Sequence, residues 1–299
     1  MPAIAKHLAV HLESVVFATD FSPASYNAGL YASAVSRHFH TGLVVAHAFV
    51  LTQAALEVEA EKPLASQQRI NLRHDLTLVA EVLESGKGPT ETTLLEGDPC
   101  AVVPALVHGS NRTLVVLGTH GRGSIDRYVL GSTAEGILRH STGPVLSVGP
   151  NVDILRAGTL NIRRILYATD CSPEAAPAAP LAVALADAFS AGLDVLNVVH
   201  STYADPAKQL DRLQAYLYDA VEAAIPQDSV HVCKPRTFVS AGKPLADILN
   251  HIDQHEIDLV ILGLHRSALL SMQNLTSGVF PIIVKAKCPV LTVASGAAF

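Results

Sequence analysis

Residues 114–132 read Leu-Val-Val-Leu-Gly-Thr-His-Gly-Arg-Gly-Ser-Ile-Asp-Arg-Tyr-Val-Leu-Gly-Ser. Four apolar residues typical of a buried strand open this stretch, and a helical pattern follows it from Thr133. Gly118 and Gly121 allow the backbone to turn tightly and to present N–H groups. A helix that begins after Gly131 adds free N–H groups and a dipole, both of which attract anions. The pattern predicts a strand–loop–helix unit that wraps a polyphosphate. The alternative is a glycine-rich loop that only reverses the chain.

The composition indicates a well-packed aliphatic protein. The chain has 299 residues, of which 49% are hydrophobic and 16% charged, and it contains no Trp. This length suits two domains, each able to bury a core. Runs of Val, Leu and Ala suit parallel strands that helices cover on both faces. The net charge of −6 argues against nucleic acid as a partner, because binding to a phosphate backbone needs a basic surface.

We expect neither a signal peptide nor a membrane-spanning segment in this sequence. The first residues lack the apolar region of a signal peptide, and no stretch approaches the roughly 20 apolar residues of a membrane span. The cysteines have no paired spacing, which favours reduced thiols over a disulfide or zinc framework. They are Cys100, Cys171, Cys233 and Cys288. We therefore expect a soluble, cytoplasmic protein that does not contact membranes.

The chain repeats itself once. The segment 15–23, Val-Val-Phe-Ala-Thr-Asp-Phe-Ser-Pro, returns at 165–173 as Ile-Leu-Tyr-Ala-Thr-Asp-Cys-Ser-Pro. The segment 114–120 returns at 259–265 in the same way. The period is too long for a solenoid repeat, so it indicates tandem domains. We expect one domain at 1–150 and a second at 162–299, joined by a linker over 150–161.

Strands alternate with helices in the first copy. The strands are predicted at 14–19, 43–49, 91–95, 113–118 and 144–148. The helices are predicted at 23–39, 65–85, 99–109 and 132–141. Ser22-Pro23 and Ser172-Pro173 each read as an N-cap followed by proline at the first helical position. This alternation predicts two Rossmann-like α/β domains with parallel sheets, and ligands bind such sheets beyond the carboxyl ends of the strands.

Several motifs together resemble the universal stress protein family. They are Ala18-Thr19-Asp20 after the first strand, His47 at the end of the second, Gly97-x-Pro99, and Gly118-x2-Gly121-x9-Gly131-Ser132. The resemblance covers both halves of the chain. It implies a five-stranded parallel sheet in the order 3-2-1-4-5 in each domain. It also implies an ATP site in members that carry the full glycine pattern.

The resemblance assigns the site residues by position. Ala18, Thr19 and Asp20 would border adenine and ribose, and the backbone of Ala48 would meet the adenine edge. The residues next to ribose and the inner phosphates would be Leu117, Gly118, His120 and Gly121. Those that hold the outer phosphates would be Gly131, Ser132 and Thr133. Arg122 and Arg127 are the basic residues inside the loop and are interpreted as neutralising phosphate charge.

The second copy departs from this pattern. Gly263 and His265 are kept, but Arg266 stands in place of the second glycine and Thr276 in place of the third. Each replacement adds a Cβ where the backbone should approach phosphate. We expect a degenerate site in the second domain, which then serves as a structural partner. One ATP is therefore expected per chain.

A metal site and a catalytic centre are not assigned from the sequence. His251 and His255 have the i,i+4 spacing of metal ligands on a helix, but no third ligand stands near them in the sequence. They are interpreted as part of a solvated helix face. The sequence contains no nucleophile elbow, Walker lysine or Cys/His signature.

Three functions remain open at this point. The first is a stress-response protein that binds ATP in its first domain and signals through nucleotide occupancy. The second is a slow ATPase, in which the phosphates would hold Mg²⁺. The third is a nucleotide-independent scaffold or carrier of a small ligand that uses the second domain.

The predicted sheet order also bears on assembly. The strands at 144–148 and 289–293 would lie at sheet edges, and exposed edges invite pairing. We therefore expect an intramolecular pseudo-dimer in which these two strands lie side by side. Homodimerisation of the chain would need a further surface and is left open.

Overall fold

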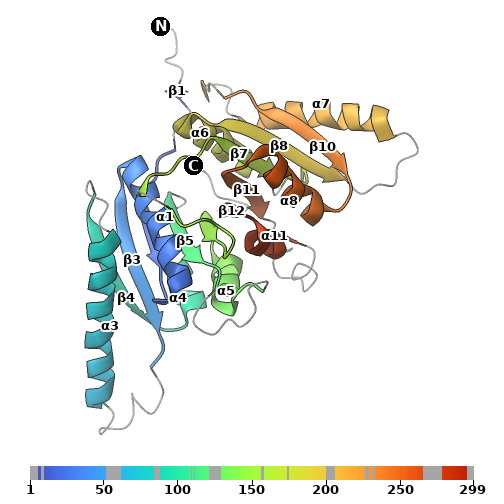
Figure 1. Ribbon diagram of the computed structural model, residues 1–299. Helices are drawn as coiled ribbons and strands as arrows, with labels where there is room; N and C mark the ends of the chain where they lie inside the picture. The colour runs from blue at the N-terminus through green and yellow to red at the C-terminus, as the bar shows by residue number, and fades with distance from the viewer. Residues whose placement is uncertain are drawn as a thin grey trace. The chain divides into compact units, whose positions relative to one another are not determined.

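The computed structural model in Figure 1 describes most of the chain. The described residues are 6–7, 10–51, 62–83, 88–108, 110, 112–120, 129–155, 158–173, 175–199, 206–225, 229–230, 233–264 and 278–294. They form two compact units. The first contains Leu12–Val148 and Ile154–Leu160, and the second contains Asn161 onward together with two short segments, Met1–His11 and Gly149–Asp153.

The first unit is a five-stranded parallel sheet in the order β4-β3-β2-β5-β6. Its strands are β2 (Ser14–Ala18), β3 (Gly42–Phe49), β4 (Thr90–Glu96), β5 (Thr113–Gly118) and β6 (Val145–Val148). The central strand β2 places Val16 opposite Val44 on one side and Val115 on the other. In chain order this arrangement is 3-2-1-4-5, so the predicted fold class is confirmed.

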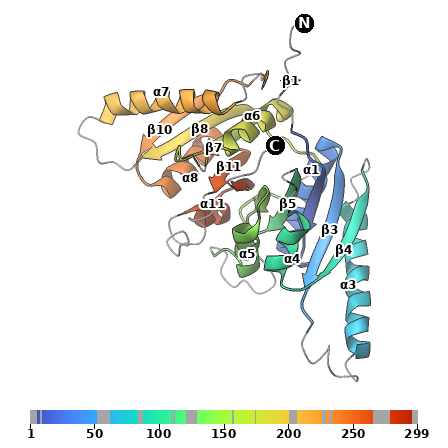
Figure 2. The ribbon, with the colours of Figure 1, turned by 180° about the vertical axis from the view of Figure 1, so that it is seen from behind.

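Helices cover both faces of this sheet (Figures 1 and 2). They are α1 (Pro23–Phe39), α3 (Lys62–Leu83), α4 (Pro99–Leu106) and α5 (Ser132–His140). Helices α1 and α3 contact each other on one face, and α4 and α5 contact each other on the opposite face. The central strands are therefore buried on both sides and read as continuous apolar runs, as in Val15–Phe17.

The second unit repeats this architecture. Its sheet order is β10-β8-β7-β11-β12, and all pairings are parallel. The strands are β7 (Arg164–Ala168), β8 (Gly192–Val199), β10 (Arg236–Ala241), β11 (Leu259–Leu264) and β12 (Val290–Ala294). The helices are α6 (Ala178–Phe189), α7 (Pro206–Ala224), α8 (Pro244–His255) and α11 (Val279–Lys285). In addition, β1 (Lys6–His7) pairs with β9 (Ser229–Val230), a pairing that the sequence did not predict.

The predicted helix start is confirmed in the first unit and wrong in the second. Ser22 caps α1, because its side chain accepts a hydrogen bond from the Ser25 N–H, and Pro23 follows as the first helical residue. Ser172 accepts the matching bond from Ala175, but α6 begins only at Ala178. Pro177 has no N–H with which to continue an α-helix, so the chain passes through tighter turns before the helix starts.

No helix in the described part of the chain is long and apolar enough to cross a membrane.

Candidate functional site

A cavity of about 730 Å³ opens at the carboxyl ends of the strands in the first unit. Ten of the twelve predicted site residues line it: Ala18, Thr19, Asp20, Ala48, Leu117, Gly118, His120, Gly131, Ser132 and Thr133. The other two, Gly121 and Arg122, lie outside the described residues. Positions separated by more than 100 residues in the sequence therefore meet in one hollow, at the place where open α/β sheets bind ligands.

The end of β2 forms a fixed turn at the cavity. The Thr19 N–H donates to the Ala46 carbonyl on β3, and the Thr19 hydroxyl accepts a hydrogen bond from the Phe21 N–H. The Asp20 carboxylate accepts another from the Ser22 N–H at 3.0 Å. Phe21 adopts a left-handed conformation, with φ of 61°. The turn thus holds the side chain of Asp20 at the cavity wall, and α1 begins directly after the turn, at Pro23.

His47 secures this turn from the neighbouring strand. Its Nδ1 lies 2.8 Å from the carbonyl oxygen of Thr19, and its ring lies 4.4 Å from the ring of Phe21, centroid to centroid. In the second unit the amide of Asn197 donates to the Thr169 carbonyl in the same way, at 2.9 Å. His47 lines the cavity. Because Asn197 makes the same contact, we attribute the interaction with Thr19 to support of the fold.

The two ends of the glycine-rich loop, Thr119 and Gly131, lie next to each other. The Thr119 N–H bonds to the Val148 carbonyl, and the Thr119 carbonyl accepts the Gly131 N–H at 2.9 Å. A Cβ added to Gly131 would lie 3.2 Å from that carbonyl oxygen, closer than nearly all real contacts. Glycine at 131 therefore allows the two ends of the loop to meet beside the cavity.

Helix α5 begins at this junction with its first turn at the cavity. Gly131 is its N-cap, and among the described residues no side chain caps it. Ser132, Thr133 and Ala134 all line the cavity. The first N–H groups of a helix lack intrahelical partners, and the helix dipole adds partial positive charge. This end of the cavity is suited to an anion such as phosphate.

The tight turn predicted at Gly118 is wrong, although Gly118 does line the cavity. It ends strand β5, and no left-handed backbone angle marks it as a tight turn. A Cβ at this position would lie 3.1 Å from the Ala24 carbonyl oxygen and 3.2 Å from the Cα of Ser25. Gly118 is therefore required for the close approach of the first turn of α1. Gly263 occupies the same place in the second unit, where a Cβ would lie 2.6 Å from the Cα of Ala175.

The remaining wall of the cavity is largely apolar. Further lining residues, which were not among the predicted contacts, include Ser25, Ala46, Pro99, Val103, Leu130 and Ile137. Pro99 and Val103 belong to α4, which the Asp98 side chain caps through the Cys100 N–H. The Gly97-x-Pro99 motif marks the start of this helix, and α4 packs against β3 and β4 with Pro99 in the cavity lining. The cavity thus combines a largely apolar wall with the N-terminus of a helix.

In the second unit the corresponding residues are described only in part. The Asp170 carboxylate accepts the Ser172 N–H at 2.9 Å, which reproduces the turn at Asp20. The residues that break the glycine pattern, Arg266 and Thr276, lie outside the described residues, as does His265. The degenerate second site stays a prediction.

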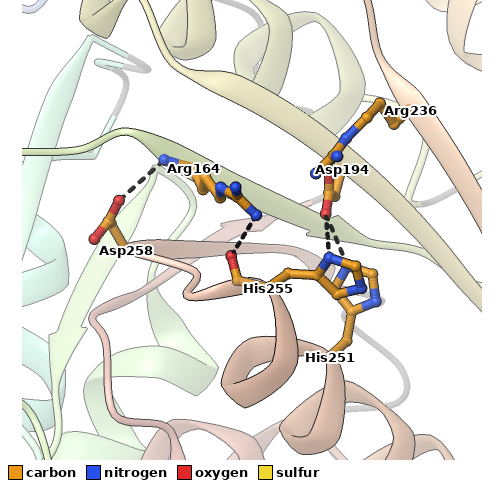
Figure 3. Close-up of polar contacts among 6 residues, drawn as sticks. All are labelled: Arg164, Asp194, Arg236, His251, His255 and Asp258. Atoms are coloured by element: carbon orange, nitrogen blue, oxygen red, sulfur yellow. Dashed lines mark hydrogen bonds and ion pairs between the residues drawn. The ribbon is translucent and has the colours of Figure 1, made fainter.

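The interpretation of His251 as part of a solvated helix face is wrong. His251 is 7% exposed, and its Nε2 lies 2.9 Å from Oδ2 of Asp194 on β8 (Figure 3). Burial raises the pKa of Asp194, but hydrogen bonds from His251 and Arg236 outweigh it and hold that pKa below its ordinary value. Asp194 stands where the first unit has Val44, as the shared register of the two sheets shows.

Comparison with known proteins identifies the family. The two domains, each with a five-stranded parallel sheet between helices, define a doubly wound, Rossmann-like α/β fold. The model of the universal stress protein family matches residues 11–149 and 161–294. The chain belongs to the universal stress protein family, with two copies in tandem.

Individual relatives agree with this assignment. Staphylococcus aureus proteins described as universal stress proteins are 37% identical over 65 residues, which is 21% of this chain. The chain spans 39% of the length of those relatives. A universal stress protein from Archaeoglobus fulgidus superposes with a TM-score of 0.70 at 18% identity, over 97% of this chain and 99% of its own. A structure from Pseudomonas aeruginosa UCBPP-PA14 gives 0.52 at 12% identity, over 94% and 93%. These structural likenesses show the fold.

Proposed function

We propose that the first unit binds ATP and that the protein acts in stress response through its nucleotide-occupied state. The observation that carries this proposal is the cavity of about 730 Å³, which is lined by ten of the positions that the family resemblance assigns to ATP. Its volume falls within the range of roughly 300–1,000 Å³ that is usual for small-molecule sites.

The chemistry of the wall matches the parts of a nucleotide. Ala46, Ala48 and Val103 offer apolar surface for a base, and Asp20 offers a carboxylate for ribose hydroxyls. The start of α5, which no side chain of the described residues caps, offers N–H groups for phosphate. Mg²⁺, where present, would be held through the phosphates of the nucleotide.

The environment of Asp20 favours binding over hydrolysis. Its carboxylate already accepts the Ser22 N–H, so it is oriented by the turn. Asp20 is half-buried at the cavity wall. We therefore assign Asp20 to positioning of the nucleotide and favour the binding function over the slow ATPase.

The repeat supplies a matched pair of variants that tests the site. Asp20→Ala and Asp170→Ala each remove the same turn hydrogen bond, which measures 3.0 Å in one unit and 2.9 Å in the other. Both should therefore lower stability by a similar amount. Asp20→Ala should also weaken ATP binding by about 10- to 100-fold, because it removes a charged hydrogen-bond acceptor from the site.

Calorimetric titration with ATP, together with thermal unfolding of each variant, measures both effects. The proposal expects Asp170→Ala to bind ATP as the unaltered protein does. Equal loss of ATP affinity in the two variants would show that the effect comes from lost stability and not from contact of Asp20 with nucleotide. Unchanged affinity in Asp20→Ala would remove this residue from the site.

A further inference from the structure

The second unit contains a cluster of metal-ligating side chains that the family resemblance does not explain. Asp194 comes from β8, and His251 and His255 come from successive turns of α8 (Figure 3). One ligand atom of each lies within 4.8 Å of the others. It is the only such group of three in the described part of the chain. This cluster is separate from the ATP proposal, which concerns the first unit.

Two of the three separations between ligand atoms approach those of a metal-bound set, and the third, between His251 and His255, is within 4.8 Å. The Asp194 Oδ2 lies 2.9 Å from Nε2 of His251 and 4.0 Å from Nδ1 of His255. Ligand bonds of about 2.0–2.1 Å in a tetrahedral site place neighbouring ligand atoms about 3.3 Å apart. The two observed separations lie on either side of that value. A shift of less than about 1 Å in either separation would bring it to the value of a tetrahedral site.

The carboxylate is held with one oxygen directed at the imidazoles. Arg236 binds the other oxygen, Oδ1, through Nε at 2.8 Å and Nη2 at 2.7 Å. Ligating carboxylates in metal sites are commonly oriented by such a second hydrogen bond. The positive charge of Arg236 weakens the attraction for a cation. However, its side chain is 53% exposed, so solvent screens much of that charge.

The two histidines are also fixed in place. Their rings stack with centroids 4.1 Å apart, and the ring of Phe238 packs against both. Arg164 anchors the end of α8 by donating to the His255 carbonyl at 3.0 Å. The side chain of His255 is 29% exposed, whereas those of His251 and Asp194 are buried. The side chains of the cluster are therefore held together by packing, and the cluster is open to solvent on the His255 side. An imidazole nitrogen binds a metal in the plane of its ring, so the stacked rings would turn when they bind one ion.

We propose that Asp194, His251 and His255 form a binding site for a first-row divalent cation, with Zn²⁺ as the representative ion. Two imidazoles and one carboxylate are a ligand set that suits Zn²⁺ and related metals. Three protein ligands leave the fourth position of a tetrahedron for water, on the exposed side of His255. The first unit has Val44 in place of Asp194, so the site belongs to the second unit alone.

The test is a titration of the metal-free full chain with zinc chloride. Binding should show one strong site per chain, with a rise in melting temperature. His255→Gln should weaken that binding at least 10-fold without unfolding the protein, because the side chain is partly exposed. Asp194→Asn should do the same. Asp253→Asn serves as the control. Asp253 lies on the same helix but outside the cluster, and its carboxylate pairs with Lys287.

Substitution with Co²⁺ gives a second readout. Its visible absorption spectrum distinguishes a tetrahedral site from loose surface binding, and His255→Gln should abolish that spectrum. The proposal is overturned if the unaltered chain takes up no Zn²⁺ at 100 µM. It is also overturned if His255→Gln and Asp194→Asn, both folded by circular dichroism, bind Zn²⁺ as tightly as Asp253→Asn.

Discussion

Gly118 and Gly263 occupy the same place in the two units, at the end of the fourth strand of each sheet. A Cβ at Gly118 would lie 3.1–3.3 Å from backbone atoms of α1, and one at Gly263 would lie 2.6 Å from the Cα of Ala175. Backbone atoms cannot move aside as the tip of a side chain can. The retention of Gly263 in the second copy therefore follows from packing and does not by itself indicate a nucleotide site.

This packing predicts the effect of adding one methyl group. Gly118→Ala and Gly263→Ala should each lower the free energy of unfolding by about 1–3 kcal/mol, with the larger loss at Gly263. Urea denaturation followed by circular dichroism measures the change. Gly192→Ala is the matched control, because its Cβ would have its nearest neighbour at 3.8 Å. Equal stability of all three variants would contradict the close approach.

At the scale of single elements, helix α3 buries one face against the rest of the first unit and exposes the other to solvent. Leu76 is 1% exposed, whereas Leu78, two residues further on, is 46% exposed. The helix packs on β3, β4 and α1. Leu76→Ala should lower the free energy of unfolding by about 2–4 kcal/mol, because it leaves a cavity in the core.

Leu78→Ala is the matched control for that variant. It removes the same atoms from a half-exposed position and should cost about 1 kcal/mol or less. Thermal or urea unfolding of both variants gives the comparison. Similar destabilisation by the two substitutions would show that α3 does not pack through Leu76 as described.

The elements of the first unit could be predicted from sequence because the boundaries carry local signals. Pro23 after Ser22, Pro99 after Asp98 and Gly131 before Ser132 each mark a helix start, and the structure has helices beginning at all three places. The late start of α6 was missed because Pro177 overrides the cap at Ser172. The pairing of β1 with β9 joins two-residue strands, which are too short to leave a periodic pattern.

Contacts between distant residues could not be predicted in the same way. The role of Gly118 depends on the distance between α1 and β5, and that distance cannot be predicted from the residues next to Gly118 in the sequence. Asp194 and His251 are 57 residues apart and meet only when α8 packs on β8. The ten described ATP-site positions came from the family resemblance, and their meeting in one cavity is a property of the tertiary fold.

At the scale of the whole molecule, the two copies share one fold and differ in their sites. The first unit has a cavity at the start of α5, and the second has the group of Asp194 on β8 with His251 and His255 on α8. Under the two proposals made above, each unit would take a different ligand. The intramolecular pairing of the two final strands stays a prediction.

The central claim is that one chain binds one ATP, in its first unit. Isothermal titration calorimetry of the unaltered full chain with ATP measures this directly. The account predicts a stoichiometry of one ATP per chain. Two equivalent sites per chain, or no binding at millimolar ATP, would contradict it.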